Sequence, residues 1–171
     1  MGSQPNRKYI VEAKPKDIDK IVEIRDELYD SLPSTQEHYY KLDPHLTIIP
    51  PFTMTELSHS ELESLVDSYQ FSGSNIHISG AGIWPSLQDP RVFLLDAEIG
   101  FIDERESLYE ELANHGAEFE YPPSPFHISL FKCINGHSIP QDFNHILQEN
   151  ILEKRESWDT TIEYCDVQLT D

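Results

Sequence analysis

The sequence predicts an α+β domain made of two matching halves. Strand and helix patterns follow one another in the same order twice along the 171 residues. Each half contains one tetrad of histidine, apolar residue, serine or threonine, and apolar residue, at 45–48 and 127–130. His45 lies 37 residues after the start of the first strand of its half, and His127 lies 36 residues after the equivalent point. This equivalence is typical of an internal duplication.

The first half has the patterns of a strand, a helix, a strand, a helix and a strand. These are expected at 8–14, at 17–32, at 45–49, from 58 onward and at 74–83. Apolar residues at helical spacing, from Ile18 to Leu32, define the first helix. Ser58 and Glu61 have the spacing of a capping box, which predicts the start of the second helix.

The second half repeats this order. Strands are expected at 91–98, 126–132 and 160–168. Asp103 is predicted to cap the helix between the first two strands, and Gly116 is predicted to end it. Pro140 is typical of the first position of a helix and predicts one before the last strand.

Length and composition favour one folded domain over residues 1–171. The hydrophobic content of 38%, with 8 Phe, 8 Tyr and 2 Trp, is sufficient for a substantial core. No apolar run reaches the roughly 20 residues of a membrane-spanning helix, and no signal-peptide stretch is recognisable. We therefore expect a cytoplasmic monomer that does not associate with membranes.

The net charge of −19 comes from 31 acidic and 12 basic residues, and the acidic residues are dispersed along the chain. At 1 M salt the Debye length falls to about 3 Å, so repulsion within such a surface fades. The composition therefore predicts a halophilic protein. It also argues against binding along a long nucleic-acid backbone, which requires many cationic side chains. A substrate derived from RNA, or another oligonucleotide, would be small or held at a phosphate end.

The two tetrads predict a shared chemical site. Side chains at i and i+2 of a strand point to the same face, so His45 accompanies Thr47 and His127 accompanies Ser129. A pair of histidines can supply a proton acceptor and a proton donor near neutral pH. Two hydroxyl groups can donate to the oxygens of a phosphate as negative charge builds. These four side chains are sufficient for acid–base cleavage of a phosphodiester.

Metal and cofactor motifs are missing from the sequence. There is no His-Glu-x-x-His run, no cysteine pair with zinc spacing and no glycine-rich phosphate loop. Asp43 is the carboxylate closest to a tetrad, and we do not expect it to bind a metal. Cys133 is expected to be a small core residue. The sequence thus predicts a site without metal or other cofactor.

The motifs resemble those of the two-histidine phosphoesterases, the LigT-like group that includes RNA 2′,3′-cyclic phosphodiesterases, also called 2′-5′ RNA ligases. The resemblance rests on Pro-His-Leu-Thr-Ile at 44–48 and Pro-Phe-His-Ile-Ser-Leu at 125–130, while 80–84 and 90–94 look like that family's middle strands. Ser129 keeps the hydroxyl of the more usual threonine. The resemblance implies a two-lobed phosphoesterase domain with pseudo-two-fold symmetry. Antiparallel sheets would face each other across a central cleft, with helices outside.

The resemblance also implies a function and roles for the residues. The expected enzyme is a metal-independent phosphoric diester hydrolase that acts on RNA-type 2′,3′-cyclic phosphates, or that cleaves or forms 2′-5′ linkages. His127 would be the base and His45 the acid, although the sequence does not distinguish this assignment from the reverse. Thr47 and Ser129 would bind the phosphate. Arg91 is a further candidate for phosphate binding near the cleft entrance.

Several other residues have patterns that need a separate interpretation. His77 also precedes a serine by two positions, but a glycine breaks the fourth position, so we expect a surface or supporting residue. Strand alternation predicts that Lys132 lies on the face opposite His127. Trp84 and Phe126 are candidates for stacking on a base, and core packing is an equal alternative. No site role is assigned to the remaining histidines: His38, His59, His115, His137 and His145.

Two other functions fit the same sequence. One is hydrolysis of cyclic or 2′-5′-linked oligonucleotide signals, since small acidic messengers suit an acidic protein as well as RNA ends do. The other is a non-catalytic module that binds a terminal phosphate. Retention of both complete tetrads argues against the second alternative, because a binding module has no need for two proton-transfer groups.

Overall fold

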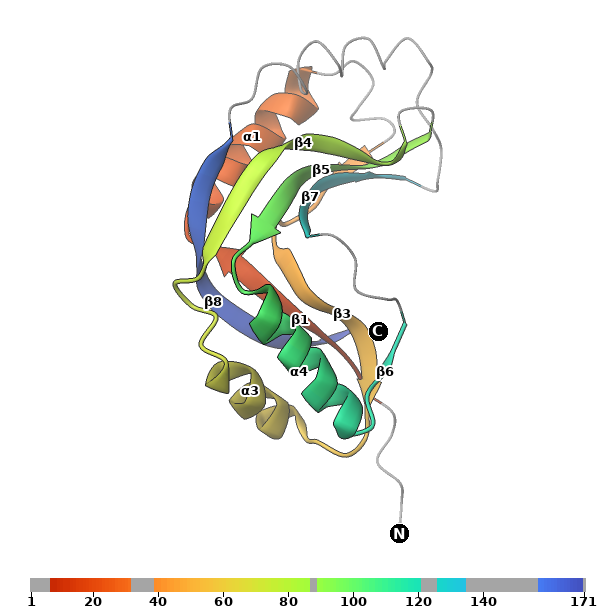
Figure 1. Ribbon diagram of the computed structural model, residues 1–171. Helices are drawn as coiled ribbons and strands as arrows, with labels where there is room; N and C mark the ends of the chain where they lie inside the picture. The colour runs from red at the N-terminus through yellow and green to blue at the C-terminus, as the bar shows by residue number, and fades with distance from the viewer. Residues whose placement is uncertain (1–6, 32–38, 87–88, 121–125, 135–156, 171) are drawn as a thin grey trace.

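A computed structural model describes residues 7–31, 39–86, 89–120, 126–134 and 157–170 (Figure 1). Within these ranges the chain is α+β, with one antiparallel sheet and three helices. The helices are α1 (Ile18–Ser31), α3 (His59–Ser68) and α4 (Ile102–Asn114). Figure 1 shows α3 and α4 together at one end of the molecule and α1 at the other.

Eight strands form a single hydrogen-bonded sheet that curves strongly along its length (Figure 1). They are β1 (Arg7–Pro15), β2 (Tyr39–Lys41), β3 (Leu46–Met54), β4 (Asn75–Ser86), β5 (Asp89–Ile99), β6 (Glu118–Phe119), β7 (His127–Cys133) and β8 (Trp158–Thr170). Their order is β2-β7-β5-β4-β8-β1-β3-β6, and an additional pairing joins β7 directly to β3. Strands far apart in this order are therefore neighbours at the β3–β7 junction.

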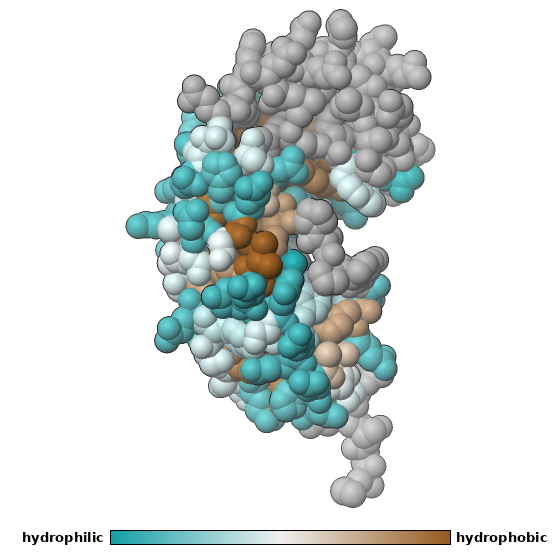
Figure 2. Space-filling view, viewed as in Figure 1, coloured by the Kyte–Doolittle hydropathy of each residue, from teal (hydrophilic) through white to brown (hydrophobic). Residues whose placement is uncertain are grey.

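The core lies on one face of the sheet, and strand alternation selects the residues that enter it. In β1, Tyr9, Val11 and Ala13 are buried, whereas the residues between them are partly exposed. Aromatic rings fill the core around β7, where the stacked rings of Phe93 and Phe131 have centroids 4.4 Å apart. Figure 2 shows that hydrophilic side chains cover most of the described surface in that view, as the net charge leads one to expect.

The predicted elements within the described residues are present, with two additions and one error. The short strands β2 and β6 were not predicted, because two or three residues carry no readable alternation. Asp103 does not cap α4: Phe101 occupies the N-cap without a side-chain hydrogen bond, and Asp103 lies in the first turn. Gly116 ends the helix as predicted, with a φ of +84° that suits glycine. The helix expected from Pro140 lies outside the described residues.

The strand registers repeat with the spacing of the tetrads. Three pairs of β1 with β3 recur between β5 and β7, 82 residues later: Val11–Ile49 and Phe93–Phe131, Glu12–Thr47 and Leu94–Ser129, Ala13–Leu46 and Leu95–Ile128. A bulge also recurs, with Ile48 and Leu130 as the extra residues. These registers support a duplication, while its two-lobed form stays a prediction.

The capping box at the start of α3 is confirmed. The Ser58 hydroxyl accepts from the backbone N–H of Glu61 at 3.2 Å, and the Glu61 carboxylate accepts from the backbone N–H of Ser58 at 3.2 Å. The hydrogen bond from the Ser58 backbone, followed by that from its side chain, lowers the pKa of Glu61 below its usual value. The box therefore stabilises α3 above the ordinary pKa of glutamate, and part of this contribution is lost as the pH falls through the lowered value.

Replacing Ser58 by alanine should lower the free energy of unfolding by about 1 kcal/mol, because the N-cap hydrogen bond is lost. Urea unfolding at pH 7, followed by circular dichroism, measures this change. Ser64→Ala is the matched control, since Ser64 is an exposed serine inside the same helix, where alanine is the better helix former. Equal losses in the two variants would contradict the capping role.

Candidate active site

The β3–β7 junction brings the two tetrads together. Its pairing joins Leu46 to Ile128, and both side chains are completely buried. The residues on either side of this pair, His45 and Thr47 in one tetrad and His127 and Ser129 in the other, are partly exposed. Because neighbouring residues of paired strands share a face, the two imidazoles and two hydroxyls surround the Leu46–Ile128 pair on the side away from the core.

His45 is held through both nitrogens of its ring. Nδ1 lies 3.0 Å from the carbonyl oxygen of Asp43, and a carbonyl only accepts, so Nδ1 carries the proton. Nε2 lies 3.3 Å from a carboxylate oxygen of Glu12 and forms an ion pair with it when the ring is protonated. The imidazole remains 37% exposed, and Glu12 is 20% exposed. Each ring nitrogen thus has an oxygen acceptor nearby, while the ring stays open to solvent.

A pocket of about 420 Å³ opens beside His45. Glu12, Asp43 and Asp166 give it an acidic wall, and Lys14 is the cation among its lining residues. Asp166, Glu12 and Thr47 stand in register across β8, β1 and β3, so their side chains share the exposed face of the sheet.

The surroundings of His127 differ from those of His45. Its neighbour across β5 is the exposed Asp96, and the neighbour of Ser129 is Leu94, which is buried. Leu94 occupies the register position that Glu12 holds in the other half. The two histidines therefore have equivalent places in the sheet, while the residues paired beside the tetrads differ. This difference is the main asymmetry of the candidate site.

The bulge in β7 corrects the predicted position of Lys132. Leu130 and Phe131 are both buried, so the alternation reverses after Leu130. Ser129 pairs with Leu94 and Lys132 pairs with Val92, and these two partners lie two residues apart on one face of β5. Lys132 thus lies on the face of His127 and Ser129. The prediction of the opposite face was wrong, because simple alternation takes no account of the extra residue.

Arg91 and Trp84 lie away from the pocket beside His45. They line a second pocket, of about 490 Å³, together with Lys132. Trp84 is 57% exposed, so of its two predicted alternatives core packing is excluded. Phe126 is buried, and its ring lies under the guanidinium of Arg105 at 4.1 Å, so Phe126 is a packing residue.

His77 and Cys133 lie where the sequence placed them. His77 is at the β4–β8 junction, where its Nδ1 lies 2.7 Å from a carboxylate oxygen of Asp159. This site is on different strands from the tetrads, and His77 is part of the exposed surface there. Cys133 is buried in the core. His59 and His115 form ion-pair contacts with Glu63 and Glu56, while His38, His137 and His145 lie outside the described residues.

Glu12 is the residue of this site that sequence reasoning missed. It stands between the buried residues Val11 and Ala13, so alternation alone turns it outward. Its position beside His45 depends on the register between β1 and β3, which no local pattern in the sequence records. The available signal was an acidic residue in a strand whose other charged residues, Arg7, Lys8 and Lys14, are basic.

Comparison with solved structures identifies the fold. A structure described as a phosphoesterase aligns over 96% of this chain and 89% of its own, with a TM-score of 0.57 and 18% identity. E. coli LigT in complex with 3′-AMP aligns over 98% of this chain and 96% of its own, with a TM-score of 0.55 and 16% identity. The chain has the LigT-like phosphoesterase fold. The protein TT0787 of Thermus thermophilus has it as well, with a TM-score of 0.53 at 15% identity over 96% of this chain and 95% of its own.

The sequence matches no protein-family model and no curated protein. Within the described part of the chain, His, Cys, Asp and Glu side chains form no group of three or more suited to a metal ion. None of the described helices is long and apolar enough to cross a membrane.

Proposed function

We propose that this protein is a phosphodiesterase that uses His45 and His127 as its acid and base, within a single two-lobed domain over residues 1–171. The observation that carries the proposal is the β3–β7 pairing, which gathers two imidazoles and two hydroxyls on one exposed face. Two groups that can exchange protons, with two hydroxyl donors beside them, suit a tetrahedral anion attacked on one side and cleaved on the other.

The proposed substrate is an RNA-type molecule that carries a 2′,3′-cyclic phosphate or a 2′-5′ linkage. The proposed biological role is RNA processing. The nucleotides bound in structures of E. coli LigT, which are 3′-AMP, ATP and NADP⁺, support a phosphate-bearing ligand for this fold. Fold alone does not determine a reaction. The proposal therefore rests on the side chains of the two tetrads.

In the proposed hydrolysis, neutral His127 removes a proton from the attacking water. The oxygen of that water bonds to phosphorus, and the bond from phosphorus to one ribose oxygen breaks. His45 donates its proton to the departing ribose oxygen. The ion pair with Glu12 supports the acid role of His45, because the pair forms only with a protonated ring. Thr47 and Ser129 donate hydrogen bonds to the non-bridging oxygens. In the ligation direction, His45 and His127 would exchange their proton-transfer roles.

His45→Ala and His127→Ala should each lower kcat on a 2′,3′-cyclic nucleotide by about 10²–10⁴-fold, because each removes one proton-transfer group. The rates are measured by chromatography of the products, with EDTA present throughout. His77→Ala is the matched control, since it removes a histidine that also precedes a serine by two positions but lies at another junction. Wild-type rates in either tetrad variant, or tight nucleotide binding without turnover in the wild type, would overturn the proposal.

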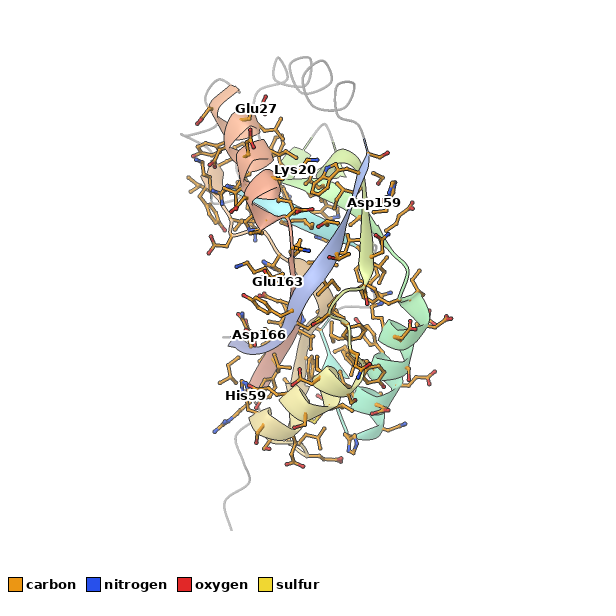
Figure 3. All side chains as sticks on the ribbon, turned by 90° about the vertical axis from the view of Figure 1, so that its left-hand side faces the viewer. Lys20, Glu27, His59, Asp159, Glu163 and Asp166 are labelled. Atoms are coloured by element: carbon orange, nitrogen blue, oxygen red, sulfur yellow. The ribbon has the colours of Figure 1, made fainter. Side chains whose placement is uncertain are left out.

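We also propose that the protein works at high salt, as its charge predicts. Figure 3 shows Asp159, Glu163 and Asp166 spread along β8, and all three are exposed. Asp166 is the register neighbour of Glu12, so two carboxylates adjoin on the face of the candidate site. Screening by salt reduces their repulsion of each other and of an anionic substrate.

The melting temperature should therefore rise between 0.1 M and 3 M KCl, as screening removes repulsion among the surface carboxylates. Scanning calorimetry measures the melting temperature. The salt is potassium chloride, because sulfate stabilises most folded proteins whatever their charge. A melting temperature that stays constant or falls over this range would contradict the halophilic proposal.

A further inference from the structure

A row of four side chains crosses four neighbouring strands beside the candidate site. Tyr40 in β2 pairs with Lys132 in β7, Lys132 pairs with Val92 in β5, and Val92 pairs with Trp84 in β4. Residues that pair across strands project to the same face of a sheet. The row therefore presents two aromatic rings with an ammonium group and an apolar side chain between them.

This row lies on the same face as the tetrads. Because the bulge at Leu130 reverses the alternation in β7, Lys132 projects on the side of Ser129. Lys132 lies three positions after Ser129 along β7, which corresponds to a distance on the order of 10 Å. A chain whose phosphate lies at Ser129 can therefore reach the row by following β7.

The side chains of the row are open to solvent. Trp84 is 57% exposed and Tyr40 is 44% exposed, and both line the pocket of about 490 Å³ that also includes Arg91. Among the described residues, the two rings make no contact with another aromatic ring and the ammonium group of Lys132 forms no ion pair. By contrast, the ammonium groups of Lys8 and Lys41 form ion pairs with carboxylates. Lys132 is thus an accessible cation in register between two exposed aromatic residues, on a protein with a net charge of −19.

We propose that the row of Tyr40, Lys132, Val92 and Trp84 binds the two nucleotides that precede the one carrying the reacting phosphate. One base would stack on the ring of Trp84, the other would stack on the ring of Tyr40, and Lys132 would contact the phosphate between them. This inference rests on the proposed function and specifies its substrate as a single-stranded oligonucleotide. A cyclic mononucleotide would occupy only the tetrads.

The test compares two substrates with the same reacting end: adenosine 2′,3′-cyclic phosphate and a triadenylate that ends in the same cyclic phosphate. Wild-type kcat/KM should be higher for the trinucleotide. Trp84→Ala and Tyr40→Ala should each lower it by about 5- to 150-fold, the equivalent of one lost stacking interaction of about 1–3 kcal/mol. Both variants should stay within about twofold of wild type on the mononucleotide.

Leu169→Ala is the matched control, because Leu169 is 55% exposed on β8, away from the row. This substitution should leave kcat/KM unchanged for both substrates. Lys132→Gln should lower kcat/KM for the trinucleotide more at low salt than at high salt, because a phosphate contact is screened. Equal losses on both substrates in the row variants, or wild-type values on both, would overturn the inference.

A binding measurement separates this inference from the proposed function. The chain has 2 Trp, so Trp158→Phe leaves Trp84 as the sole indole. A 2′-O-methyl triadenylate, which the proposed chemistry cannot cleave, should quench its fluorescence by stacking. Quenching without turnover of any substrate would support the row and overturn the proposed function. No quenching at concentrations that saturate turnover would overturn the row.

Discussion

The pairing of Leu46 with Ile128 is the constraint on which the candidate site depends. β3 and β7 are far apart in the order of the sheet, and this pairing makes them neighbours. Both side chains are completely buried, so core packing holds the junction closed. The residues beside them must then project away from the core. Two tetrads separated by 82 residues in the chain share one exposed face as a direct result.

The duplicated register gives the two histidines equivalent places, while the residues paired beside them differ. Glu12 stands beside Thr47 and forms an ion pair with His45, while the buried Leu94 holds the equivalent place beside Ser129. A symmetric arrangement alone would supply two interchangeable bases. In the proposed reaction the Glu12 carboxylate lies within reach of His45 Nε2, at 3.3 Å, and this contact supports the assignment of the donor role to His45.

Local pattern predicted the features that local physics determines. Alternation placed the second tetrad on a strand and the first at the start of one, where His45 directly precedes β3. Side-chain spacing predicted the capping box of α3, because these interactions join residues close in sequence. The position of Lys132 was wrong because a bulge appears only when two strands are paired and one has an extra residue. Glu12 was missed for the same reason, since its contact with His45 depends on register. The motifs of the site could thus be predicted from the sequence. The charged side chains that surround those motifs could not.

The central claim is that the two tetrads form one anion-binding site, and NMR of the histidine side chains tests it most directly. Adenosine 2′-phosphate or 3′-phosphate, the products of the proposed hydrolysis, would be titrated into protein labelled with ¹⁵N-histidine. The ring resonances of His45 and His127 should shift together and give one dissociation constant, while those of His77 stay in place. Shifts confined to one of the two, or two different dissociation constants, would show that the tetrads act separately and would contradict the claim.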